Sequence, residues 1–134
     1  MLSQTSLYAI RAMGYLASES VMDKKPILGK IIAEEMQIPA NFLSKILNRL
    51  VHAGLIRSIR GRNGGFVIDK PTSEVHVREI IDLFMHLDDH KDCFLNINKC
   101  DGTCGFHMGW RIITNQMEKM LDEVTIDKIL NKLN

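Results

Sequence analysis

A helix followed by a glycine-rich hairpin, within residues 39–71, constrains the fold of this chain more than any other feature. The helix is marked by PANFLSKILNRLVHAG, in which apolar residues recur at the spacing of one helix face. Pro39 stands where the helix begins, and Gly54 supplies a left-handed cap at its end. Two short runs rich in Ile, Val and Phe, 55–59 and 66–68, then flank a turn of Gly and Asn, which is typical of a β-hairpin.

Further helices surround this segment. Apolar periodicity predicts a helix over about the first twenty residues, a short helix over 27–36, an amphipathic helix over 77–87, a long helix over about 108–124 and a short tail helix over 125–133. The order of short helix, four-residue turn, second helix and hairpin is that of a winged helix-turn-helix. The fold class is therefore predicted as mainly α with a small β-hairpin.

Charge divides the chain into two parts. Residues 1–73 carry ten Lys and Arg against five Asp and Glu, and residues 74–134 carry seven against eleven, although the whole chain has a net charge of +1. A basic part joined to an acidic part suggests an anion-seeking module attached to a second unit, and chance clustering on a solvated surface is the alternative. We predict a winged helix-turn-helix DNA-binding domain over 1–73 and a helical dimerisation region over 74–134.

Cationic and hydrogen-bonding side chains lie on the face of the 39–54 helix opposite its apolar stripe. They are suited to base edges and phosphates, and the hairpin adds arginines suited to phosphate or a narrow minor groove. The predicted DNA-binding residues are Asn41, Ser44, Lys45, Asn48, Arg49, Arg57, Arg60 and Arg62. Phe42 lies on the apolar stripe and is expected in the core. The alternatives are an ordinary solvated surface and a winged helix that binds a protein instead of DNA.

All three cysteines fall in one loop, residues 91–107. Six residues separate Cys93 from Cys100, three separate Cys100 from Cys104, and His107 follows after two more. Three thiolates and an imidazole can complete the tetrahedral coordination of zinc or hold an iron–sulfur cluster. The loop lacks the paired Cys-x-x-Cys arms of a zinc ribbon, which weakens the zinc interpretation without removing it.

The first twenty residues lack the basic start of a signal peptide, and Arg11 interrupts their apolar stretch. No segment reaches the roughly 18 consecutive apolar residues of a membrane span. We therefore expect a cytoplasmic location, where reducing conditions favour metal binding or redox chemistry over structural disulfides. No nucleophile elbow, phosphate loop or paired-carboxylate pattern is present, so no enzyme is expected.

Nearly end to end, the chain resembles the bacterial winged-helix regulators that include IscR, NsrR and CymR. The likeness is carried by LYAIRAMGYLA near the start, IPANFLSKILNRLVHAGLIRSIRGRNGGF, VREIID, the cysteine loop and the closing VTIDKIL. The second motif is the most specific, because helix, glycine, arginine hairpin and double glycine occur in the family's order. The resemblance implies dimers that bind palindromic promoter DNA, many of them with an iron–sulfur cluster on three cysteines and a variable fourth ligand.

By position, Cys93, Cys100 and Cys104 match the cluster cysteines of this family, and His107 matches the histidine that completes the IscR-type site. Members that take a carboxylate from the partner's first helix carry an acid where this chain has Leu7, so the resemblance favours His107. A 2Fe–2S cluster is the favoured cofactor. A 4Fe–4S cluster stays open because the cysteine spacing differs from that of IscR, and zinc is the alternative metal.

The predicted function is a homodimeric transcription regulator, with a repressor favoured, whose promoter binding responds to redox state, nitric oxide or cluster supply. The helix over about 108–124 has more apolar positions than a small winged domain needs to cover, which favours a dimer over a monomer. Ser44 stands where IscR-type proteins carry an acidic residue, so the preferred DNA sequence stays open. The alternative function is a regulator with structural zinc or no metal, or one that acts through a protein partner.

Overall fold

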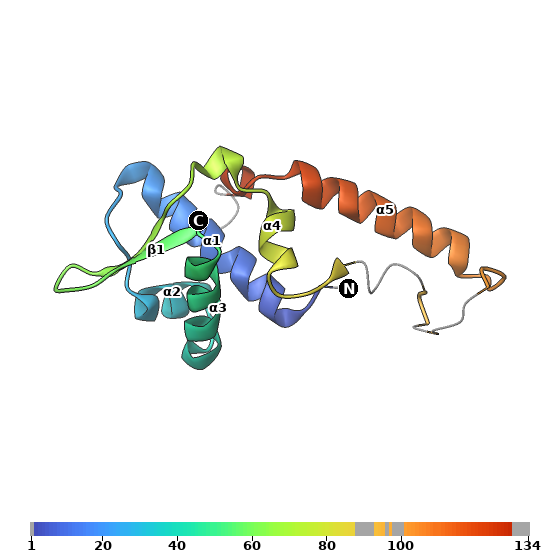
Figure 1. The fold of residues 1–134 in the computed structure, drawn as a ribbon, viewed down its shortest axis with the longest axis horizontal. Coiled ribbons are helices and arrows are strands. Elements are labelled where there is room, and N and C mark those ends of the chain that lie inside the picture. Colours follow the sequence, from blue (N-terminus) through green and yellow to red (C-terminus); the bar gives the residue numbers. More distant parts are fainter. Residues whose placement is uncertain (1, 88–92, 96, 98–100, 130–134) are drawn as a thin grey trace.

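The computed structural model describes residues 2–87, 93–95, 97 and 101–129 (Figure 1). The elements in chain order are α1 (Gln4–Met22), α2 (Gly29–Met36), α3 (Ala40–His52), β1 (Ile56–Ile59), β2 (Gly65–Ile68), η1 (Thr72–Glu74), α4 (Val77–Asp82), α5 (His107–Glu123) and η3 (Ile126–Ile129). The predicted class, mainly α with a small hairpin, is confirmed. In the part of the chain described, no helix combines the length and hydropathy needed to cross a bilayer.

The core is built around α1, which contacts α2, α3, α4, β2 and η3. Its inward face is made of small and flexible residues such as Ala9, Ala12 and Met13, all fully buried, which let the other helices approach closely. Each buried Leu, Ile or Met side chain contributes about 1.5–3 kcal/mol through removal from water. Ile80 of α4 and Ile126 of η3 belong to this same core, so part of the segment after residue 73 packs with the winged unit.

The helix-turn-helix and hairpin form where the sequence predicts them. The core face of α3 is Leu43, Ile46, Leu47 and Leu50. Gly54 has φ +77°, the predicted left-handed cap. The hairpin strands β1 and β2 pair antiparallel, with Ile56 opposite Ile68 and Ile59 opposite Gly65.

A short bridge joins the hairpin to the chain ahead of α2, and this was not predicted. Ile27 donates to the Phe66 carbonyl at 2.9 Å and accepts from the Phe66 N–H at 2.8 Å. Ile27 therefore forms an isolated β-bridge to the wing, and the helix predicted from residue 27 begins at Gly29 instead.

Three further expectations differ from the structure. The helix predicted over 77–87 ends at Asp82. The tail beyond residue 125 is a 3-10 turn over Ile126–Ile129, and its remainder lies outside the described residues. Phe42 is 50% exposed and packs on Tyr8, with ring centroids 6.4 Å apart, so its assignment to the core was wrong. It lies one helix step of about 100° from Leu43, outside the narrow stripe that the core covers.

Candidate nucleic-acid interface and metal centre

Four of the predicted DNA-binding residues form the exposed face of α3. Asn41, Ser44, Lys45 and Asn48 are all exposed, on the side away from the buried leucines and Ile46. A groove of about 540 Å³ separates this face from α2 and the wing, and Ser44, Asn48 and Phe66 contribute to its walls. A helix face that borders an open groove can enter the major groove of DNA, where such short polar side chains reach base edges.

The predicted arginines separate into two kinds. Arg60 and Arg62 are exposed at the tip of the hairpin, next to Gly61 with φ +114°, and neither has an ion-pair partner among the described residues. Arg57 instead pairs with Asp69 across the base of the hairpin, Nε to Oδ1 at 3.3 Å. Arg49 donates from Nε to the carbonyl oxygen of Leu83 at 3.0 Å. Of the four predicted arginines, the wing-tip pair is thus the one whose guanidinium groups have no such partner among the described residues.

The cysteine loop is described in part. Cys93 and Cys104 are half-buried, and Cys100 lies outside the described residues. His107 is the first residue of α5, and its N–H donates to the Cys104 carbonyl at 3.1 Å. Among the described residues, no three His, Cys, Asp or Glu side chains gather as a metal site. The structure thus places Cys104 and His107 one turn apart at the start of α5.

The imidazole of His107 lies beside Gly102. A Cβ on Gly102 would stand 3.4 Å from Nε2 of His107, and Gly102 itself has φ +82°, which favours glycine. The turn is held by Asp101, whose Oδ1 accepts from the N–H and hydroxyl of Thr103 at 3.0 and 2.6 Å. The Thr103 hydroxyl lowers the pKa of Asp101 most, and the Thr103 N–H and the charge of His107 act in the same direction. Thiols and an imidazole around such a turn fit an iron–sulfur cluster or zinc.

Three aromatic rings close the described part of the loop onto α5. Phe94 stacks on Phe106 with centroids 4.8 Å apart and an interplanar angle of 25°. Phe94 also meets Trp110 edge-on, at 5.2 Å and 70°. The residue after Cys93 is thereby tied to the first turn of α5. Our sequence analysis missed this contact, although aromatics on both sides of the cysteines were a visible signal.

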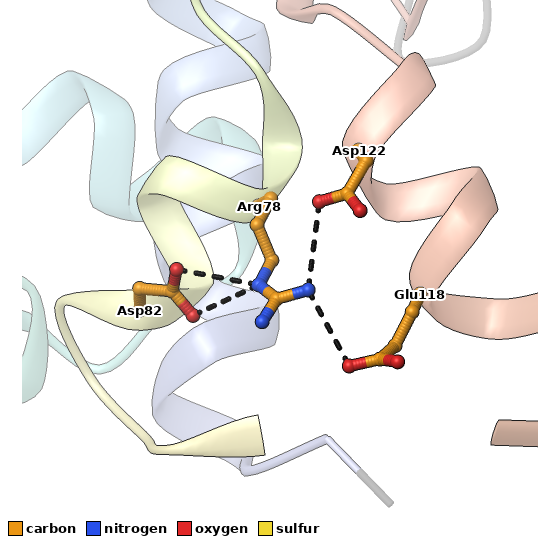
Figure 2. A network of polar contacts seen from close by, with 4 residues as sticks. All are labelled: Arg78, Asp82, Glu118 and Asp122. Atoms are coloured by element: carbon orange, nitrogen blue, oxygen red, sulfur yellow. Dashed lines mark hydrogen bonds and ion pairs between the residues drawn. The ribbon is translucent and has the colours of Figure 1, made fainter. Parts of the chain in front are cut away.

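An ionic network joins α4 to α5 and was also missed (Figure 2). Arg78 of α4 donates from Nε to the carboxylate of Asp82 at 3.1 and 3.3 Å. Its Nη1 lies 3.5 Å from Glu118 Oε1 and 3.5 Å from Asp122 Oδ1, both on α5. Burial acts to lower the pKa of Arg78, but the hydrogen bond to Asp82 and the nearby carboxylates outweigh it and raise that pKa. Four charges from two helices are thus held in one place.

Helix α5 has two faces of different character. Thr114 and Leu121 are buried against the body of the molecule. Met108, Ile112 and Met120 are exposed by 70%, 55% and 53%. In Figure 1 the N-terminal turns of α5 extend away from the other helices. An apolar helix face of this extent on a small domain is typical of an interface.

These features define a winged-helix protein with a candidate nucleic-acid interface. The chain matches, over residues 2–132, the model of the Rrf2 family, described as iron-dependent transcriptional regulators. The protein therefore belongs to the Rrf2 family of transcriptional regulators, which confirms the predicted resemblance and the absence of enzyme function. The winged-helix fold and the family membership together indicate that this protein binds DNA to regulate transcription.

Individual relatives and solved structures are also similar to this chain. The chain is 28% identical over 132 residues to the HTH-type transcriptional regulator IscR of Pectobacterium atrosepticum, covering 97% of this chain and 79% of that protein. Its fold is similar to that of T. potens IscR, with a TM-score of 0.75 and 24% identity over 100% of this chain and 88% of that one. Its fold is also similar to that of CymR, the global cysteine regulator of B. subtilis, with a TM-score of 0.78 and 21% identity over 98% of this chain and 97% of that one.

Proposed function

We propose that this protein is a homodimeric repressor whose promoter binding is modulated by an iron–sulfur cluster in the cysteine loop. In this proposal, residues 1–73 bind DNA, and residues 74–134 hold the cluster and the dimer interface. The signal is a change in redox state, nitric oxide or cluster supply. The family description as iron-dependent regulators and the thiol and imidazole groups at the start of α5 support it.

DNA binding would use the exposed face of α3 and the tip of the wing. Asn41, Ser44 and Asn48 are short enough to hydrogen-bond base edges without disturbing the fit of α3. Lys45, Arg60 and Arg62 carry the positive charge that phosphates require. The residues of α3 and the two arginines of the wing tip come from different elements, so each group can contact a different part of the duplex.

The cluster would be held by Cys93, Cys100, Cys104 and His107. The observation that supports this assignment is that Cys104 and His107 lie one turn apart at the start of α5, where the backbone N–H of His107 donates to the Cys104 carbonyl. When bound, a 2Fe–2S cluster would supply a charge that changes by one electron with redox state. The residues' own contribution is to hold the two ends of the loop together, because the Phe94 contacts with Phe106 and Trp110 bring the Cys93 side of the loop to α5.

The dimer would form through α5. Its exposed Met108 and Ile112 are four residues apart, on one face of the helix, so a second α5 can cover both at once. A symmetric dimer would present two α3 helices to successive major grooves, about 34 Å apart along the duplex. Because the two α3 helices are related by two-fold symmetry, each can contact one half of a palindromic site, and the two contacts together increase the affinity.

Metal analysis tests the cluster directly. Protein purified without oxygen should contain iron and acid-labile sulfide, and Cys100→Ala and His107→Ala should lose or alter both. His86→Ala is the matched control, because His86 is an exposed histidine outside the loop and should leave the content unchanged. Zinc in the wild-type protein with no sulfide would reject the cluster and support a structural zinc site.

The sensing role needs a second measurement. A duplex selected from random DNA by the wild-type protein serves as the probe, and its Kd is compared between the cluster-loaded and cluster-free forms. We expect the two values to differ, since only a difference in affinity makes the cluster a switch. If the cluster-loaded form, the cluster-free form and a variant without cysteines all bind the probe with the same Kd, the protein binds DNA but the proposed sensing role is rejected.

A further inference from the structure

Arg49 connects the DNA-facing helix to the helix that leads into the cysteine loop. It belongs to the last turns of α3, and its Nε donates to the Leu83 carbonyl at 3.0 Å, across 34 positions of sequence. Leu83 is the C-cap residue that directly follows α4, where carbonyl groups lack a partner inside the helix. The guanidinium of Arg49 therefore provides a hydrogen-bond donor for a carbonyl that has no partner within α4. This donor comes from α3, the helix that also carries Asn41 and Asn48.

The other side of α4 is attached to α5. Arg78, one turn before the end of α4, faces Glu118 and Asp122 of α5. The cysteine loop leaves from the segment that follows α4 and returns at His107, where α5 begins. Arg78 therefore connects α5 to α4, and Arg49 connects α4 to α3. A displacement of α4 or α5 at either end of the loop would act on α3 through these two arginines.

We propose that Arg49 is a positioning residue that sets α3 against α4, and not the phosphate contact that its charge suggests. This inference deepens the proposed function and rests on it, because the change transmitted through Arg49 is the change in cluster state. Lys45 lies one turn earlier on the same helix, is equally exposed and has no hydrogen-bond partner among the described residues. The two cations therefore have different roles, contact for Lys45 and position for Arg49.

Two substitutions at residue 49 separate position from charge. In Arg49→Gln the side-chain N–H₂ stands as far along the side chain as Nε of arginine, so it can still donate to Leu83, but the charge is gone. Arg49→Met keeps the apolar stem and removes both donor and charge. A positioning role predicts that Gln behaves as the wild type and Met does not, whereas a phosphate contact predicts that both fail alike.

The first readout is DNA affinity in the two cluster states as a function of salt. For Arg49→Met we expect the ratio of the two Kd values to fall towards one from the about 5- to 150-fold typical of such couplings, and Arg49→Gln should restore it. The log–log salt slope should change little in either variant. Lys45→Met is the matched control and should lower the slope by about one while the ratio persists. A slope lowered by about one in both residue-49 variants would overturn the proposal.

A second readout does not depend on the cluster. In the metal-free protein, DNA should slow amide hydrogen exchange at the end of α4, around residues 80–84, because α3 and α4 are fixed to each other. Arg49→Met should lose this protection and Arg49→Gln should keep it. Protection that persists in Arg49→Met would overturn the proposal. If wild-type Kd values are equal in both cluster states, the sensor fails, and this exchange measurement alone decides the role of Arg49.

Discussion

Gly65 of β2 lies against the backbone of Ile27, so close that a Cβ on the glycine would stand 2.5 Å from the Ile27 carbonyl carbon. No real side chain fits at that distance. The φ of Gly65, +142°, is also one that other residues rarely adopt. This approach allows the paired hydrogen bonds between Ile27 and Phe66 that attach the wing to the segment ahead of α2. The bridge therefore attaches the wing near the turn end of its strands, since Phe66 pairs with Ser58, one position from the Ile59–Gly65 pair beside the turn.

We expect Gly65→Ala to lower the free energy of unfolding by about 2–5 kcal/mol, from backbone strain plus the steric clash. Gly61→Ala is the control, because Gly61 has φ +114° but open space around it, so only strain of about 1–3 kcal/mol applies. Urea denaturation measures both. Equal losses in the two variants would show that the clash with Ile27 does not exist.

At the wing tip, Arg60→Ala and Arg62→Ala should each weaken DNA binding and lower the log–log salt slope by about one per lost phosphate contact. Arg57→Ala should change the slope less, because its guanidinium pairs with Asp69. Fluorescence anisotropy over a series of salt concentrations provides the slopes. An unchanged slope after both tip arginines are replaced would reject their role.

Replacement of Arg78 should weaken the attachment of α5. Arg78→Met leaves the carboxylates of Asp82, Glu118 and Asp122 close together without their cation. The side chains of Arg78 and Glu118 are only 22% and 18% exposed, so screening by water is limited, and we expect a loss of about 1–3 kcal/mol. Arg111→Met, at an exposed position of α5, should cost no more than about 0.5 kcal/mol. Equal unfolding free energies for the two variants would contradict this.

A charge on the outer face of α5 should separate the dimer. We expect Ile112→Glu to sediment as a folded monomer with weaker DNA binding, since the residue is 55% exposed within one chain but covered in the proposed pair. Ile31→Glu on α2 introduces the same change at a similarly exposed isoleucine and should remain dimeric. A dimeric Ile112→Glu protein would exclude this face as the interface.

The raised pKa of Tyr15 should make the free energy of unfolding depend on pH in the alkaline range. Burial raises its pKa above the usual 10.0, and the charges of Glu19 and Glu35 raise it further. A group whose pKa is higher in the folded state stabilises that state fully at lower pH and loses this contribution as pH rises above about 10. Tyr15→Phe should therefore show a shallower loss of stability between about pH 9 and 11, measured by urea denaturation. Tyr8→Phe is the control, and an identical pH profile for wild type and Tyr15→Phe would refute the prediction.

Local signals explain what could be predicted from sequence. A few neighbouring residues determine the 3.6-residue period of α3, the cap at Gly54 and the hairpin turn. The predicted positions of α3 and the wing are therefore correct. The end of α4 was not, because Leu83, Phe84 and Leu87 still pack in the core after the helix has ended. Apolar periodicity reports burial, and here the burial continues without the helix.

The partners of charged residues lie beyond the reach of such patterns. Charge and place on the helix face or the hairpin predict DNA contacts for Arg49 and Arg57, yet their acceptors, Leu83 and Asp69, lie outside the local sequence of each arginine. The bridge from Ile27 to the wing is likewise tertiary. The ligand set remains a prediction that rests on position in the family, since Cys100 lies outside the described residues.

The ring contact between Phe94 and Trp110 has a practical consequence. Trp110 is the only tryptophan in the chain, and its indole touches the residue that follows Cys93. Its ultraviolet emission therefore originates beside Phe94 and depends on how that part of the molecule is packed. The protein contains its own optical probe, and any rearrangement there can be followed in real time without a dye.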